Sequence, residues 1–179
     1  MGISYPDRTN TRGVWKLSEI TKNKITHGTW KGSSAGGSQR GLTGGGSTGS
    51  NVNTIQSISQ AGIGNAVDFG DLTAASAENT PAGNGIRALF AGVGTSIDTI
   101  LFSTQGNASN FGSLSTDPRQ HGSCNNSTRA LFHGNGQAPN LSVTIEYVEF
   151  ATLGFKADFG DLQTAVDREG AFSSPTRGI

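Results

Sequence analysis

A short motif recurs along the chain at a nearly constant interval, and this repetition constrains the fold more than any other feature. Its copies are Asp68-Phe69-Gly70-Asp71-Leu72, Asn110-Phe111-Gly112-Ser113-Leu114 and Asp158-Phe159-Gly160-Asp161-Leu162. An arginine lies 19 residues after the first residue of each copy, at Arg87, Arg129 and Arg177. The copies are 42 and then 48 residues apart, which is the length of one repeat in a stacked β-protein. One structural unit is therefore copied three times.

The composition agrees with a fold made of short strands and many turns. The chain has 27 glycines among 179 residues, and only 15% of its residues are charged. Low charge alone would permit disorder, but the nine phenylalanines, several at fixed offsets in the repeats, indicate a folded protein. The length suits one domain with an appendage.

Within each repeat the residues predict three short strands. An apolar strand opens at the arginine and ends in glycines, a Thr/Ile-rich strand follows, and the Phe-Gly-x-Leu segment predicts a tight turn before the next strand. We therefore expect an all-β fold of short antiparallel strands in blade-like units that must stack to bury their faces. The expected core residues are Phe69, Leu72, Leu89, Phe90, Phe111, Leu114, Leu131, Phe132, Phe159 and Leu162.

The charge distribution divides the chain into two parts. Residues 1–32 contain six basic and two acidic side chains, whereas the rest contains seven basic and eleven acidic ones. This split indicates that the first part docks on an acidic surface, although a solvated basic face is an equal alternative. Both tryptophans lie in residues 1–31, which are too few to bury them alone.

These observations predict three regions. Residues 1–31 form an extended N-terminal docking arm, 32–38 a Gly/Ser linker, and 39–179 a β-repeat domain. The docking residues of the arm are predicted to be Arg12, Val14, Trp15, Leu17, Ile20 and Trp30. The repeats span approximately 40–86, 87–128 and 129–176, and a fourth copy starts at Arg177.

The repeats resemble those of known protein families. The apolar strand that ends in glycines is similar to kelch-type propeller repeats. The longer pattern Gly64-Asn65-Ala66-Val67-Asp68-Phe69-Gly70-Asp71-Leu72, with its later Arg-Ala-Leu-Phe, resembles repeats in virion proteins of marine and cyanobacterial bacteriophages. In the arm, Gly13-Val14-Trp15 and Gly28-Thr29-Trp30 are similar to the opening of phage tail and fibre proteins. No tryptophan follows Trp30, unlike in kelch blades, and three repeats are too few to close a propeller.

The resemblance implies a structural protein of the bacteriophage particle, assembled in the host cytoplasm and located in the virion. A tail fibre or comparable appendage is the expected place, with the arm docked on other virion proteins and the repeats projecting outward. The implied state is a homo-oligomer, a trimer in the first instance, because fibre-like appendages are commonly threefold. Two alternatives stay open: a propeller module that binds a glycan on the host surface, and a capsid decoration protein.

The residues offer little chemistry, and we expect no catalytic activity, cofactor or metal site. Asp68/Asp71 and Asp158/Asp161 could bind a cation, but Asn110 and Ser113 replace them in the second copy, so a turn-capping role is favoured. The arginines Arg87, Arg129 and Arg177 could line an anion or glycan site. A bond to a neighbouring unit's carbonyls or to the turn aspartates is the favoured interpretation.

Other classes of function are not indicated by the sequence. The histidines share no ligand-like spacing with Cys124, and the chain lacks the basic stripe with aromatic residues that nucleic-acid binding requires. No run of apolar residues is long enough to insert in a membrane, and the opening residues lack a secretory pattern.

Overall fold

The computed structural model describes residues 40–120, 122–134, 141–166, 168–174 and 177–178. In this part of the chain, eleven strands form three antiparallel sheets, and no helix is present. The all-β class with short antiparallel strands is therefore confirmed. The predicted arm of residues 1–31, with Arg12, Val14, Trp15, Leu17, Ile20 and Trp30, and the linker of residues 32–38 lie outside the described residues.

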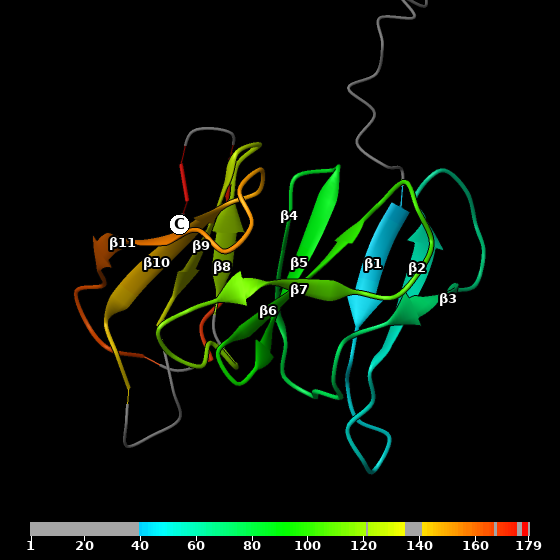
Figure 1. Cartoon of the computed structure of the whole chain (residues 1–179), viewed down its shortest axis with the longest axis horizontal. Coiled ribbons are helices and arrows are strands. Elements are labelled where there is room, and N and C mark those ends of the chain that lie inside the picture. The colour runs from blue at the N-terminus through cyan, green and yellow to red at the C-terminus, as the bar shows by residue number, and fades with distance from the viewer. Residues whose placement is uncertain (1–39, 121, 135–140, 167, 175–176, 179) are drawn as a thin grey trace, which may run out of the picture. The chain divides into compact units, whose positions relative to one another are not determined.

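The three sheets follow one another along the chain (Figure 1). The first contains β1 (Arg40–Gly44), β2 (Thr54–Ser59) and β3 (Val67–Asp71). The second has the order β4 (Thr80–Gly83), β5 (Arg87–Val93), β6 (Ser96–Leu101) and β7 (Ser109–Ser113). The third contains β8 (Ser123–Asn125), β9 (Arg129–His133), β10 (Thr144–Glu149) and β11 (Lys156–Asp161) in the same arrangement. None of the sheets closes on itself, and the second and third each begin one strand before the arginine strand.

The Phe-Gly motif lies in a strand, so the predicted turn is wrong. In the first sheet Ile55 pairs with Gly70 and Gln56 pairs with Asp68, which leaves Phe69 as the extra residue of a β-bulge. The same register shift recurs opposite Phe111 and Phe159. The motif glycines have φ angles of +149°, +155° and +139°, which other residues rarely adopt. The glycine therefore permits a bulge that points the phenylalanine out of the sheet.

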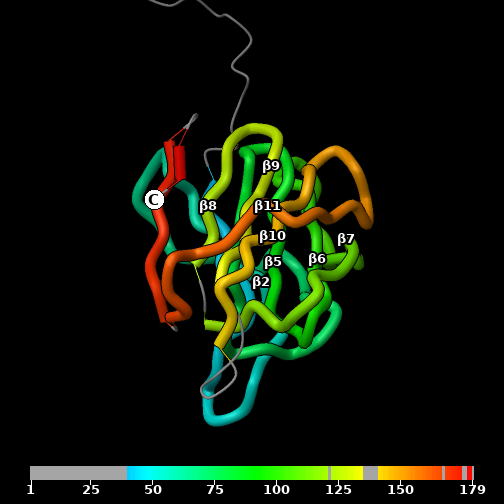
Figure 2. Tube along the Cα trace, turned by 90° about the vertical axis from the view of Figure 1, so that its left-hand side faces the viewer, coloured from blue at the N-terminus to red at the C-terminus, as the bar shows by residue number. Residues whose placement is uncertain are grey.

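The core consists of two layers, one on each side of the second sheet. Figure 2 views the chain from the side of the third sheet, whose strands lie in front of those of the second. The layer between the first and second sheets contains Ile55, Phe69, Leu72, Ala88, Phe90 and Ile100. The layer between the second and third sheets contains Ala82, Leu89, Ala91, Ile97, Phe111, Leu114, Ala130, Phe132, Val148 and Phe150. Phe69 and Phe111 thus each pack on the sheet that follows their own.

Three expected core residues are not buried. Phe159 is 54% exposed, whereas Phe69 and Phe111 are 1% and 2% exposed. Leu131 and Leu162 are only partly buried. All three correspond to residues that point toward the following sheet, and no further described sheet covers the third. The motif phenylalanine is therefore present in each copy, but it is buried only where a following sheet covers it.

Candidate functional site

A hollow with a volume of about 600 Å³ lies where the hairpins of the second and third sheets come together. We call it the hairpin hollow. Its polar lining residues are Asn84, Arg87, Asn126, Ser127, Thr128, Arg129 and Glu149. Asn84 lies in the turn between β4 and β5, and the residues from Asn126 to Thr128 lie in the turn between β8 and β9. The two arginines begin β5 and β9, and Glu149 ends β10.

Asparagine side chains shape both turns. Asn84 Oδ1 accepts hydrogen bonds from the backbone N–H groups of Ile86 and Arg87 at 3.1 and 2.9 Å. Asn126 Oδ1 accepts the corresponding bonds from Thr128 and Arg129, both at 2.8 Å. An asparagine in this position satisfies the backbone of a tight turn locally, so the arginine strand starts at a defined place. The Asn84 Nδ2 group also donates to Ser127 O at 3.0 Å and links the two turns.

The arginines stack on aromatic rings of their own sheet. The Cζ atoms of Arg40 and Arg87 each lie 5.6 Å from the ring centroids of Phe69 and Phe111. Arg129 Cζ lies 4.7 Å from the ring centroid of Tyr147. A guanidinium over an aromatic face is stabilised by the ring quadrupole. The sequence analysis missed this role, although an arginine and a Phe-Gly motif occur in every copy.

The hydrogen bonds of the arginines agree only in part with the predicted bond to a carbonyl of a neighbouring unit or to a motif aspartate. Arg40 Nη1 donates to Phe102 O of the second sheet at 3.5 Å, which is a bond to a neighbouring unit's carbonyl. Arg87 Nη1 instead donates to Thr99 Oγ1 within its own sheet at 3.5 Å. Arg129 forms an ion pair with Glu149 (Nη2–Oε1 3.6 Å), and both side chains are more than one third exposed. Such a surface pair contributes little to stability and leaves the guanidinium accessible. Arg177 supplies backbone contacts to Ser174.

The paired aspartates are not brought together. Asp68 and Asp71 lie on β3 of the first sheet, whereas Asp158 and Asp161 lie on β11 of the third. The Asp158 Oδ1 atom accepts a hydrogen bond from Gly160 N at 3.0 Å, a local contact of the kind that the capping interpretation requires. Among the described residues, no group of three or more His, Cys, Asp or Glu side chains could hold a metal ion.

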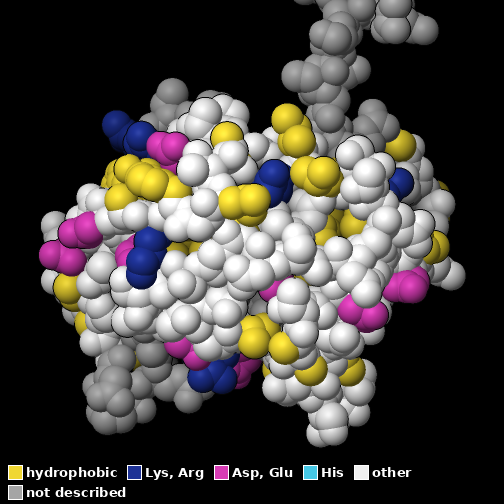
Figure 3. Space-filling view, in the orientation of Figure 1, with side chains coloured by type: hydrophobic (Ala, Val, Ile, Leu, Met, Phe, Trp, Pro, Cys, Tyr) yellow, Lys and Arg dark blue, Asp and Glu magenta, His cyan; other side chains and the backbone are white. Residues whose placement is uncertain are grey.

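The hairpin hollow combines polar groups with the apolar residues Ile86, Phe150 and Ala151. Its lining offers guanidinium, amide and hydroxyl groups with one carboxylate, and its described residues include no histidine or cysteine. These groups can hydrogen-bond the hydroxyls or a carboxylate of a sugar. On the face drawn in Figure 3, the surface is mostly uncharged, and the lysines and arginines are separated from one another.

Two buried carboxylates connect successive sheets, and the sequence analysis did not single them out. Asp98 in β6 accepts hydrogen bonds from Thr73 N and Oγ1 of the preceding repeat, both at 2.7 Å. Glu146 in β10 accepts the equivalent bonds from Ser115 N and Oγ at 2.8 and 2.7 Å. Asp98 is 2% exposed and Glu146 is 8% exposed. The available signal was an acid after the isoleucine of β6 and of β10, together with a hydroxyl residue after the first two Phe-Gly-x-Leu motifs.

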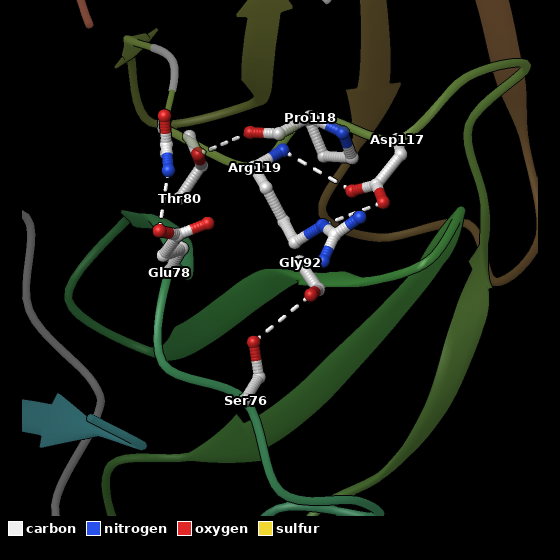
Figure 4. Close-up of polar contacts among 8 residues, drawn as sticks. Ser76, Glu78, Thr80, Gly92, Asp117, Pro118 and Arg119 are labelled. Atoms are coloured by element: carbon white, nitrogen blue, oxygen red, sulfur yellow. Dashed lines mark hydrogen bonds and ion pairs between the residues drawn. The ribbon is translucent and has the colours of Figure 1, made fainter. Parts of the chain in front are cut away.

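The segment that links the sheets adds further short polar contacts (Figure 4). Ser76 Oγ donates to Gly92 O at 2.9 Å, and Thr80 Oγ1 donates to Pro118 O at 2.6 Å. Both acceptors are backbone carbonyls, so these contacts depend on a small hydroxyl side chain at each position. The contacts hold the linking segments against the second sheet.

We expect Asp98→Ala to lower the free energy of unfolding by about 2–3 kcal/mol. The substitution removes a charged acceptor and leaves the two donor groups of Thr73 without their partner in a partly buried place. Urea denaturation followed by circular dichroism measures the change. Asp161→Ala is the control, because Asp161 is exposed and a surface substitution changes stability by about 0.5 kcal/mol or less. Equal effects of the two substitutions would contradict the role of Asp98.

Cys124 is expected to be unreactive in the folded protein. Its side chain is buried, and burial raises the pKa of the thiol above its usual value. Since the thiolate is the nucleophile, the protonated thiol at neutral pH reacts slowly. Alkylation by iodoacetamide, followed by mass spectrometry, should be at least about tenfold slower in buffer than in urea. Equal rates in the two solutions would show that the thiol is accessible.

Comparisons with known proteins support the fold but not a function. No protein-family model and no curated protein sequence matches the chain. A solved structure titled "Structure of YjhT" is similar in fold, with a TM-score of 0.62 and 10% sequence identity. The match covers 76% of this chain and 54% of that chain, so the chain spans about half the length of that protein. In the part of the chain that the structure describes, no helix is long and apolar enough to cross a membrane.

Proposed function

We propose that this protein is a structural component of a bacteriophage particle, in a tail fibre or comparable appendage. Its sheets act as kelch-like propeller blades that project outward, and residues 1–31 dock on other virion proteins. The observation that carries the proposal is the repeat itself. The Phe-Gly bulge, the arginine over an aromatic ring and the contact between a carboxylate and a hydroxyl residue all recur from one sheet to the next.

The recurring contacts are of a kind that serves assembly. They use backbone groups, short polar side chains and buried rings. The resemblance of the same positions to virion repeats directs the proposal to phage. The protein accordingly has no enzymatic role in this proposal.

Purified particles of a phage that encodes this protein provide the test. Quantitative mass spectrometry should find the chain in gradient-purified particles in a fixed ratio to the major capsid protein. An antibody raised against residues 40–174 should label an appendage in electron micrographs. Label on the capsid shell would support a decoration protein instead. Absence of the chain from intact particles would overturn the structural role.

Glycan binding at the hairpin hollow is a second candidate function, because accessible donors line it. A glycan array would identify a sugar class bound by the full chain. Arg129→Ala should then reduce binding at least tenfold, because Arg129 is half-exposed at the hollow. Arg119→Ala is the matched control, since Arg119 is equally exposed but pairs with Asp117 outside the hollow. An array without hits, or equal losses in both variants, would exclude this site.

A further inference from the structure

The interface between successive sheets has a donor side and an acceptor side, and both are built from equivalent residues in the two copies. Phe69 O accepts a hydrogen bond from Gly106 N at 2.9 Å, and Phe111 O accepts one from Gly154 N at 2.7 Å. Gly106 and Gly154 each lie five residues before the bulge phenylalanine of the following sheet. A Cβ atom on Gly112 would lie 2.8 Å from Gly154 Cα, so the two backbones are in close contact.

The acceptor side is present but unfilled on the third sheet. Phe159 is 54% exposed, and the space around a Cβ atom at Gly160 is open. Tyr147 lies next to this surface, with its ring centroid 5.8 Å from that of Phe155 and 6.1 Å from that of Phe159. Exposed aromatic side chains grouped in this way mark an interaction surface. We call it the trailing face.

The donor side is present on the first sheet, and no residue in the described part of the chain fills it. Gly64 lies five residues before Phe69, as Gly106 and Gly154 do before their phenylalanines, and nothing lies near a Cβ atom at Gly64. The adjacent Ile63 is fully exposed, and Ile58 is 40% exposed. We call the outward side of the first sheet, with Gly41, Thr43, Gln56 and Ile58, the leading face.

The sizes of the side chains on these two faces are matched to each other. On the trailing face Tyr147 occupies the position, opposite the leucine of the arginine strand, that Thr99 occupies in the second sheet. The trailing face is therefore bulkier than its counterpart. On the leading face Gly41 and Thr43 occupy the positions of Ala88 and Phe90. The leading face is correspondingly smaller, so the extra volume on one face meets the missing volume on the other.

The polar residues on the trailing and leading faces also correspond to each other. In both internal interfaces a hydroxyl residue after the motif leucine bonds a carboxylate in the next sheet. At the unfilled ends the two equivalent positions are Gln163 and Gln56, and both side chains are exposed. Two amides can donate to and accept from each other, so Gln163 and Gln56 are able to form the polar contact at this place.

The first sheet lacks a fourth strand, and after the third sheet the described residues include an isolated β-bridge at Ser173. The first sheet has three strands, and the other two have four. Residues 170–173 correspond to β4 and β8, because Ser174 repeats the turn contacts of Asn84 and Asn126. Ser173 forms a bridge to Gly178, and a Cβ atom on Gly178 would lie 2.3 Å from Cys124 Sγ. The space beside Cys124 therefore suits a glycine. The sequence Arg40-Gly41-Leu42 of the first sheet corresponds to Arg177-Gly178-Ile179 and has a glycine at the same position.

We infer that two copies of this chain associate head to tail, with the trailing face of each copy on the leading face of the other. Strand β1 of one copy replaces Arg177-Gly178 beside Ser173 of the other, and residues 170–173 complete its first sheet. Two copies contribute six sheets, within the four to eight blades that close a propeller. The match with the solved structure covers 54% of that chain, so a protein of that length has room for about twice the three sheets of one copy. The inference rests on the propeller part of the proposed function and does not depend on location in a virion.

Sedimentation equilibrium of the full chain between about 1 and 100 μM tests the association. We expect a species with twice the chain mass of 18.4 kDa. Phe159→Glu and Gly41→Val should each give a monomer with an unchanged circular dichroism spectrum. Both residues have room in their own chain, since Phe159 is exposed and the nearest atom to a Cβ at Gly41 is 3.6 Å away. Ile86→Glu is the control and should stay dimeric, because Ile86 is 67% exposed outside both faces.

A disulfide provides the second arm of the experiment. In the Gln56→Cys/Gln163→Cys chain, oxidation should join two copies, and a non-reducing gel should show a band at twice the chain mass. The unmodified chain, which has only the buried Cys124, should show none. A monomeric wild-type chain at 100 μM, a trimer or open polymer, or a dimer that Phe159→Glu leaves intact would overturn the inference. Each of these outcomes is independent of whether the protein is found in phage particles.

Discussion

Phe111→Ala is expected to lower the free energy of unfolding by about 3–5 kcal/mol, the usual cost of removing a fully buried phenylalanine. The Phe111 ring is 2% exposed and packs in the layer between the second and third sheets. Its loss would leave a cavity among Leu114, Phe132 and Phe150. The remaining side chains are held by two sheets and cannot collapse fully into that space. The Arg87 guanidinium would also lose the ring on which it stacks.

Phe159→Ala is the matched control, since it makes the same change in the same motif. Because Phe159 is 54% exposed, the expected loss is about 1 kcal/mol or less in dilute solution. Urea denaturation at several protein concentrations measures both variants. The effect of Phe159→Ala should grow with protein concentration if a second copy covers this ring, because association stabilises the folded state. Similar losses for the two variants in dilute solution would contradict the difference in packing.

The repeat made much of the fold predictable from the sequence. The spacing of the Phe-Gly motif and the arginine identified copied β-units, because equivalent residues in stacked units recur at equivalent places. Phe69 and Phe111 were correctly assigned to the core for this reason. Leu89 and Phe90 were also correctly assigned to the core, and the structure buries them on opposite faces of the second sheet.

The errors arise where the environment is set by residues distant in sequence. Phe159 has the same local sequence as Phe69, but its exposure depends on whether another sheet follows. The Phe-Gly segment was predicted to be a turn because a glycine with positive φ suits a turn and a bulge equally. Strand register decides between them, and register depends on the pairing of Gln56 with Asp68 rather than on either residue alone.

The contacts of the candidate site were only partly accessible from the sequence. The arginines were recognised as repeat positions, but their stacking on Phe69, Phe111 and Tyr147 requires the register of three strands. Asp98 and Glu146 were missed because neither belongs to a paired-carboxylate motif that the repeat spacing singles out. Comparison of the copies position by position would have found them, since both copies also carry a hydroxyl residue at the partner position.

Packing between sheets therefore limits which positions of the repeat can carry different side chains. Residues on the inner faces are constrained by close contact with the next sheet, and the polar turns at the sheet ends are free to vary. Asn84-Gly85-Ile86 and Asn126-Ser127-Thr128 illustrate this freedom, because the asparagine is kept and the following residues differ. Residues in these turns that line the hairpin hollow can therefore differ without altering how the inner faces of the sheets pack.

Gly112→Ala is expected to destabilise the protein through two separate effects. Alanine at a φ of +155° introduces backbone strain of about 1–3 kcal/mol. Its Cβ atom would also lie 2.8 Å from the Cα atom of Gly154, in the backbone of the following sheet. A backbone cannot move aside as a flexible side chain can, so this overlap costs about 1–3 kcal/mol more. The hydrogen bond from Gly154 N to Phe111 O would lengthen as the sheets separate.

Gly160→Ala separates the two effects. Its φ of +139° imposes similar strain, but the space around a Cβ atom at Gly160 is open. In dilute solution Gly160→Ala should therefore be destabilised only by the backbone strain. Gly112→Ala should be less stable than Gly160→Ala by about 1–3 kcal/mol in urea denaturation. Equal losses would mean that the sheets do not approach closely at Gly112. At high protein concentration the difference should shrink, because a second copy that places its own Gly64 against Gly160 recreates the same close contact.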